Sequence, residues 1–401
     1  MYNQGAAPLT RFYLGTFWLY AADQFVLLAA RWGVVTARGS ALTLALVFIL
    51  HALPQVAVGV LGPQRVGGHR RLPIVALLGA VFLAPVSLLA LAYGGGPLIP
   101  LLLTAALLAG WTNAVAVPLG QASLMQSLPT GQRVRGSRGY EIASRIPMLA
   151  APVVGGALLG LLGAGQLIVW ASVVLLLAAW SYPRWPSPAA LPSARFGSFG
   201  QSLRVLRDDR WLFTAMLVRA VSNLVWPAFS LGLPLIVALR LHAGALSYGV
   251  LLSCYGVATL LAAGFSARLR LGQLHWLYYV SWVLTGFGFM LLATAPSMPV
   301  AALAAVLSGI GSPLIHMALD SHIGTKVAPE AQSAVFGFQR LVISLVGLGG
   351  SYAVGLWLTV AAPGEALAGS GDVLAAVGAA GALVALLRRR SAAESEARAS
   401  E

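Results

Sequence analysis

The sequence predicts an all-α membrane protein with about twelve transmembrane helices, in two pseudo-symmetric halves of six helices each. Apolar stretches of about twenty residues recur along the chain, and a helix of that length crosses the roughly 30 Å hydrocarbon core of a bilayer. Charged residues make up 9% and hydrophobic residues 59% of the 401 residues, whereas soluble proteins carry about 25% charged residues. Most arginines lie in every second gap between the apolar stretches.

Each predicted span is an apolar stretch that is long enough to cross the membrane as a helix. The spans are residues 12–36, 40–62, 73–94, 98–123, 139–163, 165–182, 212–238, 245–267, 273–294, 299–320, 332–360 and 371–388. An even number of spans places both ends of the chain on the same side of the membrane.

The arginine-rich gaps identify the cytoplasmic side, because loops on that side carry an excess of Lys and Arg. The residues that define these gaps are Arg65, Arg70, Arg71, Arg133, Arg135, Arg138, Arg184, Arg195, Arg204, Arg207, Arg210, Arg268, Arg270, Lys326, Arg388, Arg389 and Arg390. The alternate gaps hold little more than Arg31, Arg38 and Arg240. The net charge of +14 therefore reflects the orientation of the chain in the membrane. Because no basic stripe is interleaved with soluble structure, the charge does not indicate nucleic-acid binding. Both termini are expected in the cytoplasm.

Composition divides the chain into four parts. Residues 1–181 form an N-terminal six-helix half, and residues 211–390 form a C-terminal six-helix half. The Pro-rich, basic stretch 182–210 between them is typical of a cytoplasmic linker. The polar residues 391–401 are expected to form a disordered cytoplasmic tail.

The two halves share residues at a constant offset. Pro129 recurs as Pro329, an offset of 200, and at the same offset Asp23 of the first span falls opposite Asn223 of the seventh. Parallel six-helix repeats of this kind are a recurring transporter architecture.

Common catalytic and metal-binding motifs are absent from the sequence. The single cysteine, Cys254, lies in an apolar stretch, so no intrachain disulfide can form and no Cys-based metal site is indicated. There is no phosphate-binding Walker loop, no His-Glu-x-x-His and no Gly-x-Ser-x-Gly nucleophile turn. We therefore expect no enzymatic activity, no metal and no bound cofactor.

A basic loop follows the second span. Residues 59–71 read G-V-L-G-P-Q-R-V-G-G-H-R-R, which resembles the Gly-x-x-x-Asp-Arg-x-Gly-Arg-Arg signature of the major facilitator superfamily. Twelve spans in six plus six, a basic central loop and cytoplasmic termini extend this resemblance over nearly the whole chain. The resemblance implies loop and gate contacts for Arg65, Gly67, Arg70 and Arg71. The signature's acidic position is Pro63 or Gln64 here, which puts the loop's usual charge relay in question.

The fifth span carries a second motif. Residues 151–156 read A-P-V-V-G-G, close to the Gly-Pro-x-x-Gly-Gly motif of antiporter-type members, and the chain is similar to drug and siderophore exporters. Pro152 permits bending because it removes a backbone hydrogen bond, and Gly155 and Gly156 permit close helix contact. Ordinary helix packing and a role in transport direction both remain open for these three residues.

The resemblance implies that spans 1, 4, 7 and 10 line a central cavity. Asp23 lies near the middle of the first span, where a charged side chain costs about 2.5–3.5 kcal/mol on insertion scales. We expect Asp23 to carry the proton of a proton-coupled transporter. The alternative is a static structural pair with Arg219 or Arg31.

The seventh span places a cation, an amide and an aromatic ring close together. Arg219 and Asn223 are four residues apart on one helix face, and Trp226 follows one turn later. This set suits an anionic or polar aromatic substrate. Alternatively, Arg219 extends its charged end to the cytoplasmic surface or braces a gate.

Other polar residues in the spans also have two readings. Trp111 and Asn113 in the fourth span contact either substrate or a neighbouring helix. In the tenth span, the i, i+4 pair of His316 and Asp320 either passes protons or stabilises the helix end. His51, in the middle of the second span, either titrates or forms a structural hydrogen bond.

Three charged residues near the cytoplasmic ends of the fifth and eleventh spans are expected to act as gate latches. Glu141 and Arg145 are spaced i, i+4 for an ion pair, and Arg340 lies at the corresponding depth. Such pairs can break and re-form as two halves rock.

These observations predict a monomeric secondary transporter in a prokaryotic cytoplasmic membrane, with the lipid bilayer and a small-molecule substrate as partners. Proton-coupled efflux by alternating access is the first hypothesis, with the proton gradient as the energy source. The alternatives are uptake by symport or facilitated diffusion, or a membrane sensor or enzyme that transports nothing.

Overall fold

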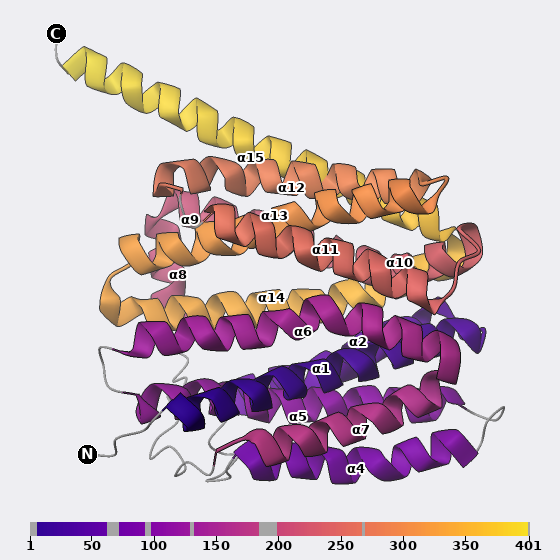
Figure 1. The fold of residues 1–401 in the computed structure, drawn as a ribbon. Coiled ribbons are helices and arrows are strands. Elements are labelled where there is room, and N and C mark those ends of the chain that lie inside the picture. Colours follow the sequence, from indigo (N-terminus) through magenta and orange to yellow (C-terminus); the bar gives the residue numbers. More distant parts are fainter. Residues whose placement is uncertain are drawn as a thin grey trace. The chain divides into compact units, whose positions relative to one another are not determined.

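The computed structural model describes residues 6–61, 72–92, 98–128, 132–183, 199–266 and 269–399, and every regular element in these residues is helical (Figure 1). The helices are α1 (Ala6–Thr36), α2 (Ala41–Leu61), α4 (Leu72–Ala92), α5 (Leu98–Ser127), α6 (Arg133–Leu162), α7 (Ala164–Ser181), α8 (Phe199–Asp208), α9 (Arg210–Val225), α10 (Pro227–Leu235), a π-helical turn (Ile236–Arg240), α11 (Ala245–Ser266), α12 (Leu271–Thr294), α13 (Met298–Lys326), α14 (Pro329–Val360) and α15 (Pro363–Ala399). Among the described residues, twelve segments are long and apolar enough to cross a membrane. The predicted fold class is confirmed.

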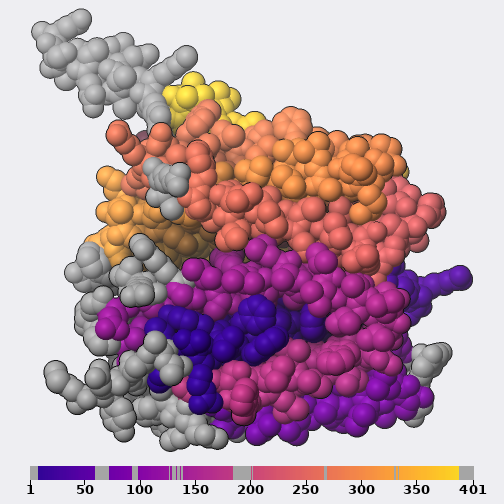
Figure 2. All heavy atoms as spheres, in the orientation of Figure 1, coloured from indigo at the N-terminus to yellow at the C-terminus, as the bar shows by residue number. Residues whose placement is uncertain are grey.

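Helices of this composition are suited to lipid. A helix pairs its backbone N–H and C=O groups internally, which the hydrocarbon core requires because it offers no water. Large apolar side chains lie on the surface, such as Leu161 at 82% and Val360 at 86% exposure. In water, exposed apolar surface on this scale would favour aggregation. Figure 2 shows how side chains fill the spaces between neighbouring helices within each unit.

The first compact unit contains Met1–Ala194 and Leu233–Ser253. Its central helix is α1, which packs against α5, α6 and α7, while α4 packs on α5 and α7, and α2 packs on α5. The Tyr182 ring lies over Gly15 of α1, where a Cβ would clash with it. Gly163 separates α6 from α7 with a φ of +84°, a conformation that side chains disfavour.

The second compact unit contains Arg195–Gly232 and Cys254–Glu401. In this unit α12 packs against both α13 and α15, and α9 packs against α14 and α15. The amphipathic helix α8 covers the basic stretch that was expected before the seventh span, and it contacts α14. The predicted division of the chain at residues 182–210 stays a prediction.

Two elements differ from the sequence expectation. The predicted span 212–238 is interrupted, because α9 ends at Val225 and α10 begins at Pro227, whose ring nitrogen cannot donate a backbone hydrogen bond. At the other end of the chain, α15 continues to Ala399, whereas its polar composition predicts a disordered tail from residue 391. The segment after Arg390 is rich in Ala and Glu, which are strong helix formers.

Candidate functional site

The first polar site joins α1 to α2 within the first unit. The Nε2 atom of His51 lies 2.8 Å from the Oδ1 atom of Asp23. The Asp23 residue is 9% exposed, and the imidazole is also largely removed from solvent. Within the first unit, Arg31, one of the alternatives expected for Asp23, forms no ion pair with it among the described residues. His51 is the partner, and the helix-to-helix pairing that brings it there could not be read from either span alone.

Both members of this pair lie deep in their membrane segments. Asp23 is 15 residues after the start of the Pro8–Thr36 segment and 13 before its end, or about 22 Å and 20 Å at 1.5 Å per residue. His51 is 10 residues after the start of Ala41–Val58 and 7 before its end, about 15 Å and 10 Å. The pair therefore lies in the middle of the apolar segments.

Gly110 of α5 packs closely against the backbone of His51. A Cβ atom at Gly110 would overlap the carbonyl oxygen of His51. The absent side chain lets α5 approach α2 at the residue that binds Asp23. No sequence motif marks Gly110, and only the contact identifies its role.

Arg31 has a different environment from the one considered in the sequence. Its guanidinium carbon lies 4.1 Å from the centre of the Phe48 ring, a cation–π arrangement between α1 and α2. The adjacent Trp32 ring stacks on Tyr248, with 5.7 Å between ring centres. Arg31 therefore contacts an aromatic ring near one end of α1.

The second polar site lies in the second unit, where Arg219 of α9 meets His316 of α13. An Arg219 terminal nitrogen (Nη2) is 3.1 Å from His316 Nε2, and the guanidinium carbon is 5.7 Å from the Trp282 ring centre. Arg219 is 6% exposed, and its Nε atom has no hydrogen-bond partner among the described residues. Within the described part of the chain, no carboxylate forms an ion pair with Arg219. The site therefore holds a buried positive charge that forms no ion pair among the described residues, although the Asp320 carboxylate is near enough to act on it electrostatically.

Asn223 and Trp226 have structural contacts in this site. The Asn223 side-chain amide donates a hydrogen bond of 2.7 Å to the carbonyl oxygen of Arg219, one turn earlier in the same helix. Trp226 ends α9 and lies against Trp282, Tyr255 and Phe289. Trp282, which sequence reasoning did not single out, contacts both Trp226 and Arg219.

The remaining predicted cavity residues are dispersed. Asp320 is exposed and accepts a hydrogen bond of 3.5 Å from the buried Gln339 amide. Trp111 is 48% exposed. Asn113 is buried, and its side-chain oxygen has no hydrogen-bond partner among the described residues. Among the described residues, no hydrogen bond or ion pair joins these three side chains to one another.

The motif of the fifth span makes close helix contacts in α6. A Cβ at Gly156 would press on the backbone of α11 at Ala245 and Leu246, and one at Gly155 would press on α1 side chains. Gly249 of α11 faces the carbonyl oxygen of Pro152 in turn. The packing role of Pro152, Gly155 and Gly156 is therefore visible, and the directional role stays a hypothesis.

The predicted latch residues lie on helix surfaces. Glu141 and Arg145 form an exposed i, i+4 ion pair of 3.5 Å on α6, and Arg340 is exposed on α14. The loop residues Arg65, Gly67, Arg70 and Arg71 fall outside the described residues.

Comparison with known proteins identifies the fold. No family model matches the chain, and no curated protein matches it by sequence. A bacterial homologue of the human lysosomal transporter Spinster, inward-facing and occupied, superposes with a TM-score of 0.65 at 15% identity, over 95% of this chain and 93% of that one. A POT family transporter bound to a thioalcohol-conjugated peptide gives 0.72 at 11% identity over 96% of each chain. The nucleoside transporter NupG gives 0.68 at 12% identity, over 94% of this chain and 97% of that one.

These neighbours are transporters of the major facilitator type. Together with the twelve apolar segments they show that the chain is a multi-pass membrane protein with the major facilitator fold.

Proposed function

We propose that this protein is a secondary transporter that moves a small molecule across the cytoplasmic membrane by alternating access, coupled to protons and in the direction of efflux. The observation that carries the proposal is the buried pair of Asp23 and His51, 2.8 Å apart at mid-depth between α1 and α2. The fold that it shares with known transporters supports the same conclusion.

Charge balance explains why this pair suits proton coupling. A neutral His51 imidazole and an Asp23 carboxylate together carry one negative charge. When the pair holds one additional proton, its net charge is zero. Loss of that proton leaves one net negative charge within apolar helices, and a charge at that depth costs about 2.5–3.5 kcal/mol or more. Proton release is therefore favourable only when water reaches the pair. Alternating access provides such a state on each side of the membrane in turn.

The Arg219 site supports an anionic substrate group. A buried guanidinium is costly unless an anion or hydrogen-bond acceptors compensate it, and here the contacts are a neutral acceptor on His316 and the Trp282 ring. A carboxylate or phosphate can accept two parallel hydrogen bonds from arginine, which a lysine cannot reproduce. Arg219→Lys should therefore weaken binding of an anionic substrate, and Arg219→Gln should abolish it.

The support for efflux comes from the fifth-span motif, which is similar to that of antiporters and forms the α6–α11 contact. Uptake by proton symport is a second candidate, and one observation favours it. His316 accepts from Arg219, so a proton on His316 is unfavourable until an anion binds beside both. Anion and proton would then bind together.

The test uses purified protein in liposomes, a broad library of small molecules and an imposed pH step. Efflux-type antiport predicts that a compound moves opposite to the protons, against its own gradient, and that collapse of the pH gradient stops it. Movement in the same direction as the protons would establish symport instead. If the rate and direction of compound movement are independent of the pH gradient, the result contradicts proton coupling.

A further inference from the structure

The short helix α8 lies at one end of the second unit, immediately before α9 in the chain. It spans Phe199–Asp208 and contacts α14 and α9. Figure 1 shows α8 running across the direction of α13 and α14, at the end of the unit where α13 stops and α14 begins. When its neighbours span the bilayer, a helix with this orientation lies along the membrane surface.

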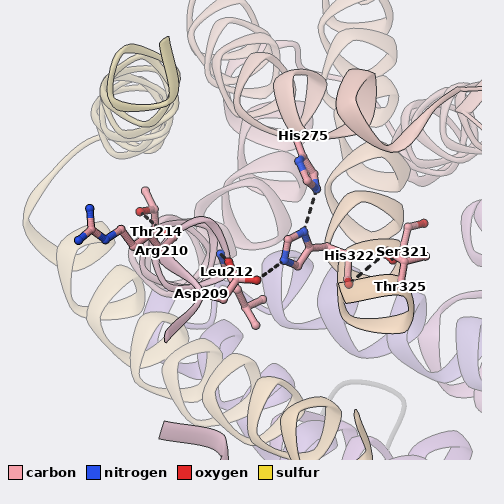
Figure 3. A network of polar contacts seen from close by, with 8 residues as sticks. All are labelled: Asp209, Arg210, Leu212, Thr214, His275, Ser321, His322 and Thr325. Carbon is pink, nitrogen blue, oxygen red and sulfur yellow. Dashed lines mark hydrogen bonds and ion pairs between the residues drawn. The ribbon is translucent and has the colours of Figure 1, made fainter. Parts of the chain in front are cut away.

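Polar contacts at the end of α8 mark the level of the membrane edge. Asp209, which follows α8, has its Oδ2 atom 2.6 Å from His322 Nε2, and His322 Nδ1 is 2.9 Å from His275 Nε2 (Figure 3). These residues lie at the ends of three apolar membrane segments, Arg210–Arg240, Leu271–Thr294 and Met298–Lys326. Asp209 directly precedes the first segment, and each histidine lies four positions inside its own. The contacts therefore bring three segment ends to one level, and α8 ends at that level.

The side chains of α8 form a packed face and an exposed face. Ser202 and Leu206, four positions apart on the helix, are both buried. Arg204 and Arg207 are exposed, and Leu203 is 46% exposed. One face thus fixes α8 to the protein, while the other presents two cations and an apolar side chain.

The exposed face of α8 carries a net positive charge. In the described part of the chain, neither Arg204 nor Arg207 forms an ion pair. Asp208 is exposed next to them, and its single carboxylate balances one of the two guanidinium groups. The next carboxylate, on Asp209, already accepts hydrogen bonds from His322 and from the start of α9.

More basic side chains lie at the same end of the unit. Arg210 is exposed, and its side chain points away from the contact between Asp209 and His322 (Figure 3). Arg270 and Lys326, at the adjoining ends of α12 and α13, are exposed as well. Clustered cations of this kind attract anions to a surface.

We propose that the exposed face of α8 binds the headgroups of anionic phospholipids, with Arg204 and Arg207 on the lipid phosphates and Leu203 against the acyl chains. A guanidinium can donate two parallel hydrogen bonds to one phosphate. The i, i+3 spacing places both arginines on one side of the helix. The headgroup layer is about 5–8 Å deep on each side of the hydrocarbon core, so a helix along the membrane edge lies within its reach.

A lipid fits this surface better than a soluble anion does. Free phosphate would satisfy the arginines but leave the Leu203 side chain in water, whereas a phospholipid offers an anionic group and an apolar chain side by side. Anionic membrane surfaces attract basic segments that lie next to membrane-spanning helices. The surface is separate from Asp23, His51 and Arg219, so its lipid binding does not depend on the proposed transport.

Native mass spectrometry of the full-length protein, titrated with phosphatidylglycerol, tests the proposal. Arg204→Gln combined with Arg207→Gln should weaken phosphatidylglycerol binding about 25-fold, because each basic residue near an anionic membrane contributes about fivefold. Binding of phosphatidylcholine with the same acyl chains should change little, since its choline group offsets the phosphate charge.

The matched control removes two arginines outside α8. Arg38→Gln combined with Arg240→Gln lowers the net charge by the same amount at two exposed positions, and phosphatidylglycerol binding should stay as in the unmodified protein. Arg204 and Arg207 are exposed, so their double variant should also unfold at the same temperature as the unmodified protein in phosphatidylcholine nanodiscs.

A spin label at position 203 locates α8 without removing an arginine. Cys254 is the single cysteine of the chain, so Leu203→Cys in a Cys254→Ser background carries one label. In nanodiscs that contain phosphatidylglycerol, the label should collide more with oxygen, which concentrates in lipid, than with a water-soluble nickel chelate.

Four results would overturn the proposal. Equal phosphatidylglycerol binding by the Arg204 and Arg207 double variant would show that these side chains do not hold lipid. An equal loss in the Arg38 and Arg240 control would show general charge attraction. Competition by millimolar inorganic phosphate would show a site for soluble anions. A label at position 203 that meets the chelate more than oxygen would place α8 in water.

Discussion

Removal of either partner from the Asp23–His51 pair should destabilise the protein strongly. The carboxylate and imidazole are 2.8 Å apart and largely buried. Removal of one partner of a buried hydrogen-bonded pair leaves the other group unsatisfied, which costs about 1–3 kcal/mol and more when that group is charged. We therefore expect Asp23→Asn and His51→Gln each to lower the free energy of unfolding by about 2–3 kcal/mol, with the larger loss in His51→Gln because it leaves the Asp23 carboxylate without the imidazole.

The double variant gives the decisive comparison. When both partners are replaced, no unpaired charge remains, and Asn and Gln side chains can hydrogen-bond to each other. The double variant should therefore lose little more than one single variant. The coupling energy from the four proteins should be about 2–3 kcal/mol, at the upper end of the range for groups in contact. Reversible unfolding of the four proteins in the same lipid nanodiscs measures it.

Asp23→Asn combined with Arg31→Gln is the control cycle, because Arg31 lies against Phe48 and not against Asp23. Its coupling should be close to zero. Additive losses in the Asp23–His51 cycle, with a coupling below about 0.5 kcal/mol, would refute the claim that the two side chains act as one unit.

Three further predictions concern other positions. Gly110→Ala should cost about 1–3 kcal/mol of unfolding free energy or more, because its Cβ would overlap the His51 carbonyl oxygen, whereas Gly160→Ala, with open space around the new Cβ, should be neutral or slightly stabilising in the same assay. Asp209 has a folded-state pKa below its ordinary value, so its stabilising contribution is present above about pH 4 and disappears as the pH falls through the folded-state pKa. In an unfolding titration from about pH 5 to pH 3, the unmodified protein should therefore lose more stability than Asp209→Asn, and equal losses would contradict this reasoning. Glu141→Gln should change stability by less than about 1 kcal/mol, because its ion pair is solvent-exposed, and a larger loss in thermal unfolding would show that the residue has a contact beyond that pair.

Hydropathy alone predicted most of the fold, because the bilayer sets the length of each span and forces backbone groups to pair within it. The interruption at Trp226 and Pro227 was readable in principle, since proline lacks the N–H that a continuing helix uses. The helical continuation of α15 to Ala399 depends on helix propensity, which the polar composition of the tail obscured.

The partners of the polar residues were less accessible from sequence. Asp23 was identified by its cost in the membrane, but its partner His51 is 28 positions away on another helix. The same limit applies to Asp209 and His322, which are 113 positions apart, and no local pattern records which helices meet. Asp209 did carry one signal, because it directly precedes a helix at a position where its side chain can cap the first turn.

Transport by the Asp23→Asn variant tests the central claim most directly. Purified unmodified protein and Asp23→Asn are reconstituted side by side, and a transported compound is followed both under a pH gradient and in exchange across equal pH. Proton coupling through Asp23 predicts that the variant loses accumulation against the compound's gradient but still exchanges it. Accumulation by Asp23→Asn that equals that of the unmodified protein would show that the proton travels by another route.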